Sequence, residues 1–486
     1  MQNHLAGIDF AQLPATIQDA ITVTRELGIR YLWIDSLCII QDSPSDKDRE
    51  ISRMAEIYKN ATVTISVASA SSYYMGFLHS RQDTEPKAVL HFPFECPDGQ
   101  MGSIVATDSF YDPTAEPINQ RGWTYQETLL SPRILTYGSK QMYWNCITET
   151  RTDGGPAEFA TDPLFLRRAG IHKYFFNPEE WVELGKYRTS KLVETWHSMV
   201  TAYTHRKLSV ATDKLPALAG IASQFQKFGC ATYLAGLWSN ALVYQLGWFQ
   251  HPTDIVNSAA GVERGKPSWS WVSVEGVVDF LDDGNAVLYE SEGAEMQEVQ
   301  ELADILDSTD GTIAGKLELM YSGLIQQQGT SLMPDNTRST DRRTHVLECT
   351  TVLELPRVPF GKVKSGLLRI QGPLIEDTSL EELRRQTIAA NRYWVSFASE
   401  QDSLQTGEYD AVLLDAGILL GLHAPIALLE LWREVGLLGG VCGLVLTRTE
   451  ESCYERIDAF QCQYDTRKKG SRSWLEDSRE CTVTIV

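Results

Sequence analysis

Residues 121–135 read RGWTYQETLLSPRIL, a helix-forming segment followed by the beginning of a strand. Trp123, Gln126 and Glu127 stand at positions i, i+3 and i+4, so a helix places them on one face. A carboxylate beside an indole is suited to clamp the sugar of a nucleotide. A structural alternative pairs Glu127 with a neighbouring arginine and buries the apolar residues of the helix. The residues that this alternative uses are Arg121, Arg133, Trp123, Leu129 and Leu130.

The segments around this stretch predict alternating helices and strands. Helix-like patterns cover residues 14–28 and 45–60, and strand-like patterns cover residues 31–34, 62–69, 134–137 and 141–146. This alternation is typical of a sheet with parallel neighbours and helices on its faces. Asp35 follows the predicted strand 31–34, and ligands collect at the carboxyl ends of such strands. Asp35 therefore either caps the following loop or faces a pocket.

Three blocks of sequence together resemble one protein family. They are YLWIDSLCIIQD at 31–42, MAEIYKNA at 54–61 and RGWTYQETLLSPRIL at 121–135. In order and wording they are similar to the heterokaryon incompatibility (HET) domain of filamentous fungi, over about residues 5–150. KLPALAGIA at 214–222, YLAGLW at 233–238 and PSWSWVSVEG at 267–276 resemble the region that follows this domain.

The resemblance departs from the family pattern at its beginning. HET domains usually open with a strand and turn reading approximately Leu-Ser-Tyr-x-Trp-Gly, some tens of residues before the block YLWID. Only about thirty residues precede that block here. The first family block is therefore missing, either because the sequence is shortened or because the sheet of this variant lacks an element.

The resemblance implies a fold and a site. HET domains are thought to be distant relatives of TIR domains, so the implied fold is a flavodoxin/TIR-like α/β sheet with flanking helices. In TIR enzymes a glutamate on a helix after a tryptophan cleaves the nicotinamide–ribose bond of NAD. Glu127 is then the expected catalytic residue, with NAD as substrate and without a cofactor. The expected substrate-binding residues are Asp35, Arg121, Trp123, Gln126, Trp33 and Gln41.

Composition excludes several other classes of protein. The 64 acidic and 43 basic residues of the 486-residue chain give a net charge of −21, which argues against a basic nucleic-acid-binding face. The nine cysteines are scattered and form no CxxC pair, so neither a disulfide framework nor a zinc site is predicted. No apolar run of about twenty residues appears, so we expect a cytoplasmic protein without a membrane span.

The rest of the chain predicts two further regions. Residues 151–265 are expected to be helical, including 179–211, 215–228 and 233–248, after a HET-like domain at 1–150. Residues 266–486 are expected to be β-rich with helical inserts, one of them at 426–435. The predicted strands of this region are 270–274, 367–370, 393–397, 411–414, 441–447 and 456–460.

Three functions from different classes are compatible with this sequence. The first is an effector of fungal non-self recognition that promotes growth arrest or programmed cell death, with Glu127 acting on NAD. The second is a non-catalytic scaffold that acts by self-association or by binding another incompatibility protein. The third is a HET-fold protein recruited to small-molecule, biosynthetic chemistry.

Overall fold

The computed structural model describes fourteen stretches of the chain, which fall into two compact units. The described residues are 7–79, 89–97, 99–107, 115–153, 176, 188–250, 266–281, 339–354, 360–378, 411–413, 426–435, 438–449, 452–465 and 478–486. Unit 1 spans Met1–Asn240, Ala260–Asp279 and Thr350–Gly366, and unit 2 spans Ala241–Ala259, Phe280–Cys349 and Leu367–Val486.

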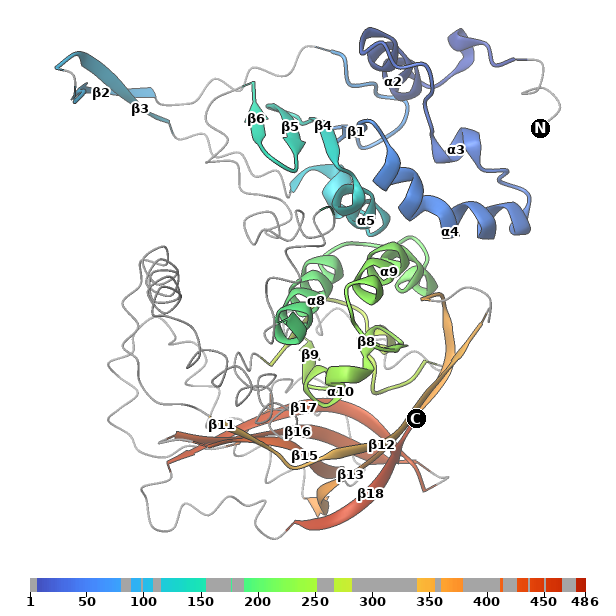
Figure 1. Cartoon of the computed structure of the whole chain (residues 1–486), viewed down its shortest axis with the longest axis vertical. Coiled ribbons are helices and arrows are strands. Elements are labelled where there is room, and N and C mark those ends of the chain that lie inside the picture. The colour runs from blue at the N-terminus through green and yellow to red at the C-terminus, as the bar shows by residue number, and fades with distance from the viewer. Residues whose placement is uncertain are drawn as a thin grey trace, which may run out of the picture. The chain divides into compact units, whose positions relative to one another are not determined.

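Most of the described helices belong to unit 1 (Figure 1). The α-helices are α2 (Ala15–Glu26), α3 (Asp35–Cys38), α4 (Pro44–Asn60), α5 (Trp123–Leu130), α8 (Arg188–Thr204), α9 (Ala219–Lys227) and, in unit 2, α10 (Leu242–Gln245). The 3-10 helices are η1 (Phe10–Gln12), η3 (Pro117–Gln120), η6 (Ala211–Asp213), η7 (Pro216–Leu218), η8 (Ser239–Ala241) and η9 (Trp271–Ser273). None of the described helices combines the length and the apolar character needed to span a bilayer.

The N-terminal region is a mixed α/β structure, as predicted. Its main sheet has the order β1 (Thr64–Val67), β4 (Arg133–Tyr137), β5 (Met142–Cys146) and β6 (Thr150–Thr152). Strands β1 and β4 are parallel, whereas β4, β5 and β6 are joined by antiparallel pairings. A second, two-stranded sheet pairs β2 (Val89–Glu95) with β3 (Met101–Thr107).

Local sequence signals explain the helices that flank this sheet. Helix α4 begins after Ser43, whose hydroxyl accepts a hydrogen bond from the Asp46 N–H at 3.3 Å, and Pro44 occupies its first turn. Helix α2 buries Ala20 and Val23 against one face of the sheet. The predicted helices at 14–28 and 45–60 are confirmed, as are the predicted strands at 62–69, 134–137 and 141–146.

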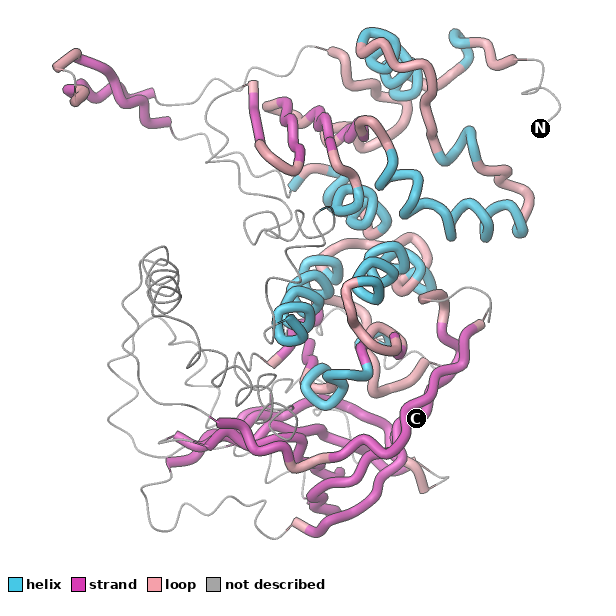
Figure 2. The backbone as a smooth tube through the Cα atoms, in the orientation of Figure 1, coloured by secondary structure: helices cyan, strands magenta, loops and turns pink. Residues whose placement is uncertain are grey.

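The strand predicted at residues 31–34 is wrong, because this segment forms no ladder. It runs extended between α2 and α3 without a β partner, and Figure 2 draws it as loop. Its apolar character comes from packing: Leu32 and Ile34 contact the same small core as Ile65 and Val67 of β1. A strand needs a hydrogen-bonded neighbour, and β1 is the terminal strand of the described sheet.

The second half of unit 1 is built around aromatic side chains. Trp196 of α8 is fully buried and meets Trp238 and Phe225 edge-on at ring-centroid distances of 5.5 and 5.2 Å. Helices α8 and α9 confirm the described part of the predictions at 179–211 and 215–228; residues 179–187 lie outside the described residues.

Two predictions in the middle of the chain are wrong. Residues 233–248 were predicted as helix but contain strands β7 (Tyr233–Leu234) and β8 (Leu237–Trp238), η8 and α10, followed by β9 (Trp248–Gln250). Ala235 and Gly236 have φ angles of 48° and 95°, which a helix does not accept. Residues 270–274 were predicted as strand but form η9, because the Ser270 hydroxyl accepts a hydrogen bond from the Val272 N–H at 3.2 Å.

Unit 2 is β-rich, as predicted. Its sheet runs β11-β15-β16-β17-β18-β13-β12, with β14 on β17, and an additional β15–β13 pairing closes five strands into a ring. The strands of this sheet are β11 (Ser339–Arg342), β12 (His345–Leu353), β13 (Val363–Thr378), β14 (Ala411–Leu413), β15 (Ile426–Val435), β16 (Leu438–Arg448), β17 (Tyr454–Asp465) and β18 (Arg479–Ile485), of which residues 350–353 and 363–366 are assigned to unit 1. Strand β10 (Val278–Phe280) pairs with β9.

Four of the predicted C-terminal strands are confirmed, at 367–370, 411–414, 441–447 and 456–460, whereas 393–397 lies outside the described residues. The helical insert predicted at 426–435 is wrong. This segment is strand β15, which pairs with β11, β13 and β16. Leu428, Leu429 and Glu430 are successive buried residues there, so both faces of the strand are covered and tertiary pairing overrides helix propensity.

Unit 1 also contains a segment from late in the chain, residues 350–366. The Phe360 ring lies 5.2 Å from that of Tyr233. The Lys362 Nζ lies 3.0 Å from the Thr212 hydroxyl and 3.2 Å from an Asp213 carboxylate oxygen. Unit 1 is therefore assembled from three separate stretches of sequence.

We predict that Gly220→Ala destabilises the protein by about 1–3 kcal/mol, because the new methyl group overpacks a closed interface. A Cβ at this position would lie 2.7 Å from Ala55 Cβ, 2.8 Å from Gln126 Oε1 and 3.0 Å from Leu130 Cδ1. Thermal unfolding followed by circular dichroism measures the loss. Gln226→Ala, at an exposed position of the same helix, is the control and should change stability by less than about 0.5 kcal/mol. Equal stability of the two variants would contradict the close packing.

Candidate functional site

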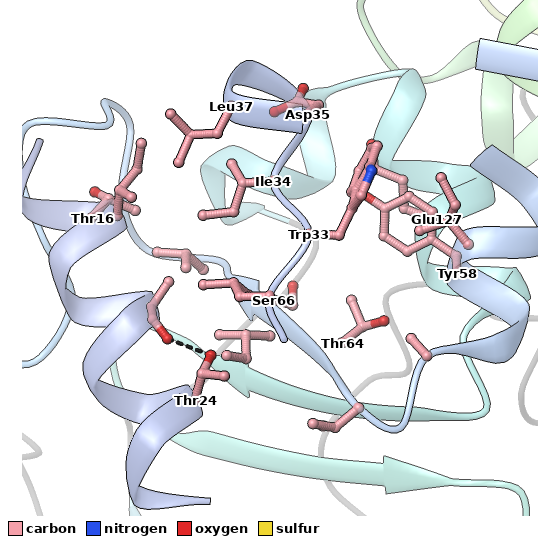
Figure 3. Close-up of a pocket in the computed structure, with 18 of the residues that line it drawn as sticks. Thr16, Thr24, Trp33, Ile34, Asp35, Leu37, Tyr58, Thr64, Ser66 and Glu127 are labelled. Atoms are coloured by element: carbon pink, nitrogen blue, oxygen red, sulfur yellow. Dashed lines mark hydrogen bonds between the residues drawn. The ribbon is translucent and has the colours of Figure 1, made fainter. Parts of the chain in front are cut away.

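A large cavity lies in the N-terminal α/β region, between the segment 29–37 and strand β1 (Figure 3). Its volume is about 910 Å³, near the upper end of the range for small-molecule sites, about 300–1,000 Å³. Helices α2, α4 and α5 contribute the remaining walls. The charged residues in the lining are Asp35, Arg121 and Glu127.

Helix α5 carries Glu127 and is held from several sides. The Gln126 side-chain oxygen accepts a hydrogen bond from the Gly220 N–H at 3.1 Å. The Gly122 N–H donates to the Lys207 carbonyl at 2.8 Å, and the Lys207 N–H donates to the Gln120 carbonyl at 2.7 Å. Leu129 and Leu130 are fully buried. These contacts fix the helix, so its cavity-facing residues have a defined position.

Glu127 and Tyr58 form the centre of the polar wall. The Tyr58 hydroxyl and the Glu127 carboxylate interact, and each changes the pKa of the other. Burial raises the pKa of Glu127, and the interaction with Tyr58 and the positive charge of Arg121 act in the opposite direction. Burial and the nearby Glu127 raise the pKa of Tyr58, so the phenol stays protonated.

One further aromatic ring, that of Trp33, stands beside this pair. Trp33 meets Tyr58 edge-on, with ring centroids 5.9 Å apart, and Figure 3 shows Trp33, Tyr58 and Glu127 next to one another on the same wall. Asp35 lies at the beginning of α3, where its Oδ1 accepts the Ser36 N–H at 2.6 Å, and it is exposed to solvent. Helix α3 has no side-chain cap hydrogen bond, and Asp35 lines the cavity.

Arg206 reaches this site from outside the N-terminal sheet. Its guanidinium Nη1 donates to the Thr124 hydroxyl at 3.1 Å and to the Arg121 carbonyl at 3.3 Å. Its Cζ lies 5.0 Å from the centroid of the Tyr125 ring. Burial lowers the pKa of Arg206 to about 10, so it remains charged at neutral pH and lowers the pKa of Glu127.

The structure brings four of the seven sequence-predicted site residues to one cavity and leaves three outside it. Glu127, Asp35, Arg121 and Trp33 all line the cavity. Gln126 faces Gly220, Trp123 is not part of the lining, and the Gln41 amide donates to two backbone carbonyls, those of Asp35 at 3.2 Å and Ile39 at 3.0 Å.

Sequence reasoning missed two residues that act on Glu127: Tyr58, which lines the cavity, and Arg206, which is not part of the lining. Tyr58 stands in the block MAEIYKNA, and its place one residue after the apolar Ile57 gave it the appearance of a core residue. Arg206 follows Glu127 by 79 positions, and no spacing rule links the two. Only the packing of the 205–208 segment on α5 brings this arginine to the site.

Comparison with protein families gives one match, to the N-terminal part of the chain. Residues 2–127 match the family described as heterokaryon incompatibility protein (HET). The matched range ends at Glu127 and also contains Trp33, Asp35 and Arg121, which line the same cavity. Comparisons with curated proteins and with solved structures gave no match.

We predict that Glu127→Gln becomes increasingly more stable than the wild type as pH rises. The pKa of Glu127 is raised in the folded protein, so the folded state binds its proton more tightly than the unfolded state does. Stability is therefore highest below the unfolded pKa and falls as pH rises through the folded pKa, and glutamine abolishes this loss. Melting temperatures of both proteins between pH 4 and pH 8 test this; a pH-independent difference would contradict it.

Proposed function

Residues 2–127 of this chain are a HET domain, and from that premise we propose that the protein is an effector of fungal non-self recognition. In this proposal the N-terminal region is a flavodoxin/TIR-like module that promotes growth arrest or cell death in the cytoplasm. Its activity is cleavage of the bond between nicotinamide and ribose in NAD, and Glu127 is the catalytic residue.

The observation that carries the proposal is the partly buried Glu127 carboxylate on the wall of a cavity of about 910 Å³. Cleavage of a ribosyl bond develops positive charge at the anomeric carbon, and a carboxylate facing that carbon stabilises the charge. Burial raises the pKa of Glu127, and the interaction with Tyr58 and the Arg121 and Arg206 charges act against that rise, toward the ionised form that this role requires. Burial strengthens the interaction because it excludes water.

The other residues of the wall fit parts of the same substrate. Arg121 offers a guanidinium for a phosphate, since a planar fork of N–H donors matches phosphate oxygens. Trp33 and Tyr58 offer aromatic surface for a flat ring. Asp35 places a negative charge at the exposed end of the cavity, which is suited to the cationic nicotinamide ring of NAD.

One observation favours the scaffold function as a second candidate. Strand β1 ends the described sheet and has the cavity, rather than another strand, on its open side. Open sheet edges pair with other chains. A scaffold needs no catalytic carboxylate, so the two functions differ in their dependence on Glu127.

We predict that the full-length protein releases nicotinamide from NAD and that Glu127→Gln reduces the rate at least about 100-fold, because the variant cannot stabilise the developing charge. Chromatography of the reaction mixture measures the product. Glu56→Gln replaces an exposed glutamate on α4 and is the matched control, with unchanged activity expected.

The outcome separates the candidate functions when it is combined with expression in a fungal host. Loss of both nicotinamide release and growth arrest in Glu127→Gln supports the effector enzyme. Growth arrest that persists in Glu127→Gln, with no nicotinamide release by the wild type, would sink the enzyme proposal and support the scaffold.

A further inference from the structure

The segment 31–34 occupies the position of a strand without being paired as one. Its side chains alternate as in a strand: Leu32 and Ile34 face the α2 side together with Ile65 and Val67, whereas Trp33 contacts Tyr58 of α4. The side chains of strand β1 alternate between the same two sides. Ile65 faces the α2 side, whereas the hydroxyl of the preceding residue, Thr64, lies 2.7 Å from the Ser131 hydroxyl at the end of α5. The two backbones thus lie in one layer, between the same helices.

The pairing of β1 shows which of its backbone groups face this segment. The Ala68 N–H donates to the Tyr137 carbonyl of β4, and in a parallel ladder alternate residues point to the same neighbour. The N–H and C=O groups of Ile65 and Val67 therefore point away from β4, toward the cavity. Residues 31–34 border the cavity from its other side. We call the space between residues 31–34 and β1 the slot.

The volume of the cavity corresponds to one strand. A strand takes about 4.8 Å along the hydrogen bonds, about 10 Å across the sheet and about 3.3 Å along the chain for each residue, or about 160 Å³ per residue. The cavity of about 910 Å³ then holds about six residues, a typical strand length. Two backbone edges that face each other across such a volume are complementary to a single extended chain.

The protein itself carries a strand of matching length and chemistry. Strand β3 (Met101–Thr107, MGSIVAT) has seven residues, no charge and no proline. Among the described strands it pairs only with β2, and a lone two-stranded hairpin is marginally stable in water. The hairpin exposes three large apolar side chains, Phe92, Phe94 and Met101.

We propose that β3 of one chain inserts into the slot of a second copy of this chain. In the hairpin β3 forms one ladder; in the slot it forms two, with residues 31–34 and with β1. In sequence, β3 consists only of apolar, small and hydroxyl residues, which are the kinds of residue that line the slot at Leu32, Ile34, Thr64 and Ile65. Within one chain β3 remains on β2, so the donor is a second copy.

This contact is head-to-tail, because the donor strand and the acceptor slot are different surfaces of the chain. Such contacts propagate into open chains unless the geometry closes a ring. The slot is part of the cavity whose wall carries Glu127, so β3 and a nucleotide would exclude each other there, and the test of the contact involves no NAD.

Two variants of the full chain remove one side of the contact each. The Cys96 N–H donates to the Gln100 carbonyl, which fixes the alternation of the β2–β3 ladder and points the Val105 N–H away from β2. Val105→Pro therefore removes a donor from the outer edge of β3 only. Ile65→Pro removes the equivalent donor from the slot side of β1. His91→Pro alters the outer edge of β2 and is the matched control.

We predict that the wild type and His91→Pro increase in apparent mass between about 1 and 100 μM in sedimentation velocity, whereas Val105→Pro and Ile65→Pro each remain monomeric. An equimolar mixture of these two variants has one intact donor and one intact slot, so it should form dimers and no larger species. Dimer formation also demonstrates that both variants are folded.

Hydrogen exchange of the wild type gives a readout without any substitution. Amides of residues 31–34 and of Ile65 and Val67 should exchange at least about ten times more slowly in the assembled protein than at low concentration. A wild type that stays monomeric, variants that assemble like the wild type, or assembly without slower exchange at these amides would each overturn the proposal. If these amides already exchange slowly in the monomer, the slot is filled by a segment of the same chain, and this result would also overturn the proposal.

Discussion

The position of the candidate site depends on one close contact, the hydrogen bond from the Gly220 N–H to the Gln126 side chain. No side chain fits at residue 220, because α4, α5 and α9 meet there within van der Waals distance. This contact sets the rotation of α5, and the next residue along that helix, Glu127, is thereby directed to the cavity. Gly220 of the block KLPALAGIA is thus a packing residue, and its partner Gln126 directly precedes Glu127 of the polar wall.

The site extends beyond the range of the family match. Residues 2–127 contain Trp33, Asp35, Tyr58, Arg121 and Glu127. Arg206, Lys207 and Gly220 follow that range in the sequence, yet Lys207 and Gly220 hold the beginning and the middle of α5, and Arg206 lowers the pKa of Glu127. A description of the domain by its matched residues alone therefore omits part of the structure that makes its polar wall.

Sequence reasoning succeeded where the determining signals are local. The strands around residues 134–146 follow from strand-like runs and a short turn, and α4 follows from its apolar stripe and the acidic residues of its first turn. Sequence reasoning failed where the secondary structure of a segment depends on a pairing partner that is distant in sequence. Residues 31–34 have the composition of a buried strand but no ladder, and the leucine-rich segment 426–435 becomes β15 because three strands pair with it. At the site, resemblance placed Glu127, Asp35, Arg121 and Trp33, while Tyr58 and Arg206 required the three-dimensional packing.

The late segment of unit 1 has a consequence for how the protein is made. Phe360 and Lys362 complete the surroundings of Tyr233 and of the Thr212–Asp213 turn, so unit 1 lacks part of its framework until residue 366 has been synthesised. During translation, the N-terminal α/β region leaves the ribosome long before residue 366 has been synthesised. The chain thereby imposes an order on its own biogenesis, in which an incomplete or prematurely terminated product lacks a piece of the unit that carries the polar wall.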